Sequence, residues 1–236
     1  MKPTDNEEAK LIKFWCFDKN LFDEPNDPVP MSDTLPEWYR KAERYIGGDQ
    51  ARPTWKACMS FMDAMSVGYA LKTPADIFIQ HDGDDLLITI DEKYKTFLQI
   101  REAMDGFVTP DNCYPKHIAI YPQWGVELPE GYSALYTAPL NRFEQPFVVT
   151  NGIIENDTII TPGLIPVFLK SNFQGCIPKG TPFIQIFPFK RENWTHAATL
   201  LTEEEYAMRN EYDRQFFRSA PTGVYRKKIW KRKVFK

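Results

Sequence analysis

From about residue 74 to residue 190, the apolar positions fall in short runs separated by turn-forming residues. The runs begin roughly every ten residues, a rhythm typical of a β-sandwich or barrel. The pair Asp82-Gly83 stands between two of them and predicts a β-hairpin. Residues 91–105 fit either a helix or a strand, because their periodicity does not separate the two. The nine expected strands occupy residues 77–79, 86–90, 94–100, 117–121, 132–136, 147–150, 153–160, 165–170 and 183–189.

Two earlier segments have apolar residues at helical spacing instead. The first covers residues 35–46 and should end at Gly47-Gly48. The second begins near Thr54 and should close at Gly68 in a left-handed cap. Its methionines are expected in the core, although a methionine stripe can also line an adaptable binding groove. The apolar face of this helix is formed by Trp55, Cys58, Met59, Phe61, Met62 and Met65.

A third helix is predicted from Glu203 to about Phe217. Thr202 and Glu205 form a capping box, and three consecutive glutamates occupy the first turn, where the helix dipole favours negative charge. The pattern therefore divides the chain into three parts. These are an extended N-terminal arm with a short helix (1–53), a β-rich core domain (54–200), and a C-terminal helix followed by a tail (201–236).

Proline content supports a loop-rich, mainly β protein that is α+β overall. The 236 residues include 19 prolines, above the usual share, and proline interrupts helices. Four of these prolines lie within residues 23–36, which favours an extended path for the arm. The arm is expected to pack on its own domain, or to exchange between the subunits of an oligomer.

The charge distribution singles out the last eleven residues. They contain seven of the 29 basic residues and no acid, so the preceding 225 positions hold 22 basic against 32 acidic residues. This tail could be solvated, docked on the acidic body or on a neighbouring subunit, or bound to nucleic acid or an acidic protein partner. The candidate polyanion-binding residues are Arg226, Lys227, Lys228, Trp230, Lys231, Arg232, Lys233 and Lys236.

The sequence lacks the common short motifs for metal binding, hydrolysis and nucleotide binding. The four cysteines form no CxxC pair, and the three histidines have no ligand spacing, so we expect free thiols and no metal site. The acidic run His81 to Asp85 fits a solvated hairpin turn better than a cation site. No GxSxG, P-loop or GxGxxG motif is present. The polar start of the chain and the lack of a long apolar run lead us to expect an intracellular, cytoplasmic protein with no membrane partner.

Residues 128–189 contain three motifs in the order Pro139-Leu140-Asn141-Arg142, Gly152-Ile153-Ile154-Glu155 and Gly180-Thr181-Pro182-Phe183-Ile184-Gln185. In this they resemble the β-clip proteins of the dUTPase and dCTP deaminase superfamily. Those families place a proline-led substrate loop, a Gly-Val-Ile-Asp turn and a Gly-x-x-x-x-Gln strand in the same order. Gly68 to Leu71 faintly resembles the first family motif. The resemblance implies a β-clip or jelly-roll-like barrel or sandwich with a few flanking helices, assembled as a trimer.

The sequence departs from the motifs of the resembled family at several positions. Leu140 and Asn141 stand where the family carries phosphate-binding side chains, which leaves Arg142 as the charged member of the loop. Ala70 replaces the first-motif aspartate. If the family activity survives, Glu155 activates water, Arg142 and Asn141 hold phosphate, Gln185 supports the base pocket, and magnesium is the cofactor.

The whole chain also resembles a group of uncharacterised tailed-phage proteins. The shared segments are Leu35 to Trp38, Cys58 to Ala64 and Gly180 to Arg191. We therefore expect a non-enzymatic, homo-oligomeric binding or structural protein of phage type, without a cofactor, located in the host cytoplasm or the virion. Other virion or assembly proteins are possible partners, and nucleic acid is a further one through the tail. The alternative is a magnesium-dependent nucleotide pyrophosphatase.

Overall fold

The computed structural model describes residues 10–22, 26–48, 52–82, 85–103, 105–161, 163–216 and 224–236. Three expectations fall partly outside these ranges. They concern the Asp-Gly hairpin turn, the first part of the proline-rich stretch, and the segment that connects the last helix to the tail.

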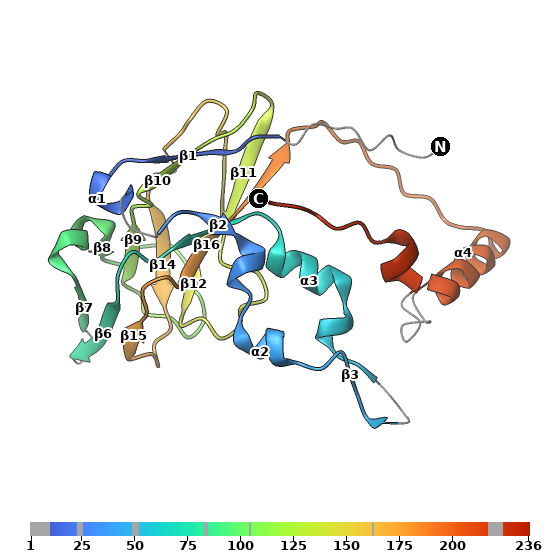
Figure 1. Ribbon diagram of the computed structural model, residues 1–236, viewed down its shortest axis with the longest axis horizontal. Helices are drawn as coiled ribbons and strands as arrows, with labels where there is room; N and C mark the ends of the chain where they lie inside the picture. The colour runs from blue at the N-terminus through green and yellow to red at the C-terminus, as the bar shows by residue number, and fades with distance from the viewer. Residues whose placement is uncertain are drawn as a thin grey trace.

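Antiparallel strands dominate the described residues, which confirms the mainly β fold class (Figure 1). Each of the nine apolar runs contains a strand. One sheet has five strands in the order β13-β11-β16-β5-β2, a second has β12-β14-β9-β8, and a third has β15-β6-β7. The strands of these sheets are β2 (Val29–Pro30), β5 (Tyr69–Lys72), β6 (Ile77–Asp82), β7 (Asp85–Ile90), β8 (Leu98–Arg101), β9 (His117–Ile120), β11 (Tyr132–Thr137), β12 (Phe147–Val149), β13 (Gly152–Ile154), β14 (Ile165–Leu169), β15 (Gly175–Ile177) and β16 (Pro182–Lys190).

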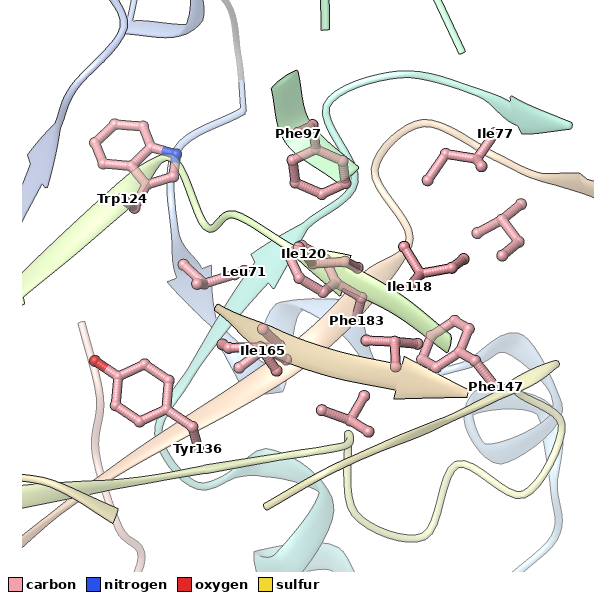
Figure 2. Packing of buried hydrophobic residues seen from close by; sticks show 14 of the residues in the cluster. Leu71, Ile77, Phe97, Ile118, Ile120, Trp124, Tyr136, Phe147, Ile165 and Phe183 are labelled. Carbon is pink, nitrogen blue, oxygen red and sulfur yellow. The ribbon is translucent and has the colours of Figure 1, made fainter. Parts of the chain in front are cut away.

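The core lies where side chains of these sheets meet (Figure 2). Leu71 and Tyr136 of the five-stranded sheet share one buried cluster with Ile118 and Ile165 of the four-stranded sheet. Phe183, only 2% exposed, packs edge-on against Phe97 at 5.5 Å between ring centroids. Burial of this single cluster supplies the main driving force for folding.

The described part of the N-terminal arm packs on its own chain. Strand β1 (Lys13–Cys16) pairs with β10 (Trp124–Glu127), and β2 pairs with β5 at the edge of the five-stranded sheet. Short helical segments α1 (Lys19–Phe22) and η1 (Met31–Thr34) connect and follow these strands. Of the two expectations for the arm, this arrangement corresponds to packing on its own domain.

The two predicted N-terminal helices are both shorter than expected. Helix α2 covers only Glu37–Lys41, and Ala42 is already extended, because the chain then forms a two-stranded hairpin of β3 (Tyr45–Ile46) and β4 (Arg52–Pro53). The second helix is divided at Cys58 into the turn η3 (Trp55–Ala57) and helix α3 (Met59–Ser66).

The apolar face predicted for the second helix is correct for Met59 and Met65 and wrong for Trp55 and Cys58, both of which are exposed. Met59 and Met65 are 4% and 1% exposed, whereas Trp55 is 61% exposed. The break at Cys58 turns Trp55 away from the core. Gly68 has the left-handed conformation that was expected, with φ of +77°, but the helix already ends at Ser66 and Val67 is extended. The ambiguous stretch after residue 91 forms the 3-10 segment η4 (Glu92–Phe97), followed by strand β8.

Helix α4 (Glu203–Phe216) confirms the third helix and its capping box. The Thr202 amide donates to Glu205 Oε2 at 2.9 Å, and the Glu205 amide donates to Thr202 Oγ1 at 3.2 Å. Figure 1 shows α4 away from the sheets, while the segment with η6 (Tyr225–Ile229) leads back to them. None of the described helices is long and apolar enough to cross a membrane.

Candidate functional site

The proline-led loop after β11 forms a tight turn. The Arg142 amide donates to the Pro139 carbonyl at 3.4 Å, and Asn141 has φ of +59°. Asparagine tolerates this left-handed conformation better than most residues, which accounts for its presence. Its side-chain amide reaches the Phe61 carbonyl at 3.5 Å. Asn141 therefore shapes the loop and links it to helix α3.

The charged member of this loop, Arg142, is held by neighbouring groups. Its side chain is 10% exposed, its Nε pairs with Glu144, and its Nη1 donates to the Thr34 carbonyl at 2.9 Å. These contacts use two of the five N–H donors of the guanidinium, and the burial of the side chain restricts the approach of a phosphate to the others. Arg142 thus links the loop to η1.

Gln185 lies in the middle of β16 and is fully buried. Its Oε1 accepts from the Leu140 amide at 2.8 Å. Its Nε2 donates to the Ala64 carbonyl at 3.0 Å and to the Val67 carbonyl at 2.7 Å. The side chain therefore ties the five-stranded sheet to both the proline-led loop and the end of α3.

Glu155 is exposed and lies away from these residues. The predicted turn from Gly152 to Glu155 is wrong, because Gly152–Ile154 forms strand β13 on β11 and the turn begins at Glu155. Register places Ile154 beside Ala134 of β11, and Gln185 beside Thr137 on the opposite side of that strand. Ile154 and Gln185 are thus offset by three residues, roughly 10 Å, along β11, and Glu155 lies beyond Ile154. A single chain does not bring Glu155 and Gln185 together.

The turn after Glu155 is anchored by Asn156, a residue that none of the sequence motifs includes. Asn156 is fully buried, and its Oδ1 accepts from the Tyr136 hydroxyl at 3.1 Å. Its Nδ2 donates to the Ile159 carbonyl at 3.0 Å. Burial raises the pKa of Tyr136, which keeps this hydroxyl neutral and able to donate. Nothing in the local pattern distinguishes Asn156 from a surface asparagine.

An ion pair between Asp157 and Arg191 closes the same turn. The Arg191 Nη2 contacts one carboxylate oxygen, Nη1 contacts the other at 2.9 Å, and the Gly131 amide adds a bond at 2.8 Å. The Asp157 side chain is 6% exposed. The hydrogen bond from Arg191 lowers the pKa of Asp157 from 3.8 to about 2, assisted by the Gly131 amide.

This pair predicts an acid-dependent contribution to stability. The lowered pKa of Asp157 means that its stabilisation is fully present above about pH 4 and is lost as pH falls through about 2. We expect Asp157→Asn to be less stable than wild type in urea unfolding at pH 6, with a gap that narrows below pH 4. Asp111→Asn, at an exposed position, serves as the matched control. A gap that stays constant down to pH 2 would contradict this assignment.

The basic tail is docked on the body through its aromatic residues. The Trp230 indole N–H donates to the two Asp63 carboxylate oxygens at 2.9 and 3.1 Å, and Lys233 pairs with the same carboxylate. Phe235 packs edge-on against Tyr69 at 5.7 Å between ring centroids. The tail cations that remain exposed are Arg226, Lys227, Lys228, Lys231, Arg232 and Lys236. Trp230 is engaged by helix α3 and does not present a free ring.

One large cleft contains none of the predicted site residues. It measures about 860 Å³ and lies between the start of α1, the η4–β8 segment, and the loops that follow β9 and precede β14. Phe17 and Tyr121 bring aromatic rings to it, and Lys19 brings a cation. Sequence reasoning missed this cleft because its walls come from four distant segments.

Metal ligands are not gathered anywhere in the described ranges. These residues contain no group of three histidine, cysteine or acidic side chains able to hold an ion. His81, from the hairpin that was considered for a cation, lies within 2.8 Å of the Phe173 carbonyl through Nε2 and stacks on Tyr114. Hairpin β6–β7 itself is confirmed, with Asp82 opposite Asp85.

No protein-family model matches the chain, and no curated protein matches it. Solved structures that align with it include EIAV dUTPase, at 12% identity over 58% of this chain and 85% of that chain, with a TM-score of 0.31. A mutant dUTPase from phage phi11 of S. aureus aligns at 18% identity over 45% of this chain and 97% of that chain, with a TM-score of 0.26. A mutant dUTPase of Staphylococcus bacteriophage 80alpha with dUpNHpp aligns at 12% identity over 82% and 89%, with a TM-score of 0.31. At these values the alignments assign no activity.

Proposed function

We propose that this protein is a non-enzymatic, homo-oligomeric binding or structural protein of phage type, built on a dUTPase-like β-clip scaffold. The observation that carries the proposal is the use of Gln185. The side chain expected in a base pocket makes three hydrogen bonds to backbone groups of its own chain. The same residues that would bind a nucleotide in the resembled family here connect elements of the scaffold.

Arg142 and Glu155 support the same interpretation. Arg142 is paired with Glu144, and Glu155 is exposed on the far side of β11 from Gln185. General acid–base catalysis requires the base within hydrogen-bond reach of the reacting group. A magnesium ion would fit Glu155 only with phosphate oxygens completing its coordination, since this carboxylate is not part of a ligand cluster among the described residues.

The segment that leads away from the body favours a role in assembly. Trp194, Leu200 and Met208 are 84%, 95% and 70% exposed, on the strand-free stretch before α4 and on α4 itself. Exposed apolar surface of this kind is typical of sites that bind another protein. Virion or assembly proteins, or further copies of this chain, would cover it.

The test is a screen of the purified protein against the nucleoside triphosphates with magnesium, recording pyrophosphate release. We expect no release from wild type, and none from Glu155→Gln. In the enzymatic alternative, wild type releases pyrophosphate. Glu155→Gln then releases it about 10²–10⁴-fold more slowly, while its melting temperature equals that of wild type. Glu204→Gln, on the exposed helix α4, is the matched control. Release that Glu155→Gln abolishes and Glu204→Gln retains would overturn the proposal.

A further inference from the structure

A second, smaller cleft lies beside helix α2, outside the regions that the family resemblance covers. It measures about 340 Å³ and is bounded by α2, the β3–β4 hairpin and η3. Its walls are mainly apolar and aromatic. The lining residues that matter here are Trp38, Tyr39, Ile46, Pro53, Trp55 and Lys56.

Trp55 forms a rigid and accessible aromatic surface in this cleft. Its ring stacks on Phe61 at 5.3 Å between centroids with an interplanar angle of 27°, and Phe143 meets it edge-on at 6.1 Å. Phe61 in turn stacks on Tyr39 at 6.1 Å. The Trp55 side chain remains 61% exposed and Trp38 is 38% exposed. Stacked rings that keep free surface are the platforms on which unpaired bases bind.

The segment that forms the cleft is basic, although the chain as a whole carries a net charge of −3. Residues 37–56 include five basic and three acidic side chains. Glu37 is paired with Lys41. Arg44 and Arg52 form no ion pair with any residue that the structure describes, and Arg52 lies opposite Ile46 in the β3–β4 hairpin. These cations are available for phosphate groups.

Tyr39 adds a polar group that lacks a partner. Its side chain is 4% exposed, and its hydroxyl has no hydrogen-bond partner within the described ranges. Burial raises the pKa of this phenol, which keeps the hydroxyl protonated.

We propose that the cleft between α2, β3–β4 and η3 binds single-stranded nucleic acid, with bases stacked on Trp55 and Trp38 and the backbone phosphates along Arg44 and Arg52. The combination of free aromatic surface and unpaired cations favours this ligand over an apolar or proline-rich peptide, which would need no basic segment. Binding in this cleft requires neither a particular oligomeric state nor a lack of hydrolysis. The cleft is also distinct from the tail, where the Trp230 indole is hydrogen-bonded to Asp63.

The experiment is a titration of full-length protein into a labelled single-stranded oligonucleotide of about 12 nucleotides, followed by anisotropy at low and moderate salt. Wild type should bind, and Trp55→Ala should weaken binding about tenfold or more. Trp55→Phe should retain most of the affinity. For Arg52→Gln, the slope of the logarithm of the binding constant against the logarithm of the salt concentration should be smaller in magnitude than for wild type by about 0.7. A duplex of the same sequence should bind more weakly, because its bases are already stacked.

Two controls keep the result specific. Trp15→Ala removes another exposed tryptophan, on β1, and should leave binding unchanged. The full-length triple variant Arg226→Gln, Lys227→Gln, Lys228→Gln tests the tail. Binding that this triple variant abolishes and Trp55→Ala preserves would overturn the proposal, as would negligible binding by wild type at low salt. Melting temperatures of all variants identify any loss that comes from unfolding.

Discussion

Replacing Gly68 by alanine should destabilise the protein by about 4 kcal/mol or more, enough to prevent folding in many small proteins. Two independent effects act at this position. Gly68 has φ of +77°, a conformation that costs an alanine about 1–2 kcal/mol. An added Cβ would also lie 2.0 Å from the Ile186 carbonyl oxygen and 3.0 Å from its carbon.

The clash at Gly68 cannot be relieved by moving a side chain. Ile186 belongs to β16, which pairs with β11 on one side and β5 on the other. The Gly68 carbonyl also accepts from the Met31 amide at 2.9 Å, so its own backbone is held by η1. A shift of either partner therefore disturbs the centre of the five-stranded sheet.

Urea unfolding followed by circular dichroism measures this effect, and Gly180→Ala provides the matched control. Gly180 has a similar φ of +81°, but an added Cβ there would meet nothing within 4 Å. We expect Gly180→Ala to lose only the conformational part, about 1 kcal/mol. An equal decrease in the free energy of unfolding for the two variants would contradict the close approach of Gly68 to β16.

Gln185→Leu should also be strongly destabilising, by about 3 kcal/mol or more. Leucine preserves the size of the side chain but leaves the Leu140 amide and the Ala64 and Val67 carbonyls without their partner. Each buried polar group left unpaired costs about 1–3 kcal/mol. The three groups belong to separate segments, so the loop after β11 and the end of α3 should both loosen.

The control for this prediction is Gln80→Leu, at an exposed position of β6. We expect that substitution to change the free energy of unfolding by no more than about 0.5 kcal/mol. If Gln185→Leu is as stable as wild type, the Gln185 amide is not holding the scaffold together. It would then be free for a ligand, and the enzymatic alternative would gain support.

The local sequence pattern predicted the strands within the nine apolar runs, because each of these runs stands between turn-forming residues. The capping box of α4 was equally readable, since Thr202 and Glu205 interact with their own helix end. The strands that were not predicted are β1, β2, β3, β4, β5, β10 and β15. They are short, and β5 follows Gly68 without a separate turn signal.

The helix predicted over residues 35–46 failed for a tertiary reason. Its apolar residues have helical spacing, but Tyr39 is buried by stacking on Phe61, and Tyr45 pairs with Pro53 across the β3–β4 hairpin. Phe61 lies 22 residues after Tyr39, and Pro53 lies 8 residues after Tyr45, so neither partner is within the reach of one helical turn. Intrinsic helix propensity is a weak term and yields to such contacts.

The pattern of residues along the chain therefore specifies the mainly β class, the hairpin β6–β7, helix α4 with its cap, and the charge of the tail. The role of each motif residue depends on its contacts in the tertiary structure. Whether Gln185 faces a ligand or the Ala64 carbonyl, and whether Trp55 is buried or free, depends on which distant segment lies beside it. Side-chain partners across separate strands and loops are set by packing of the whole chain, and local sequence carries no record of them.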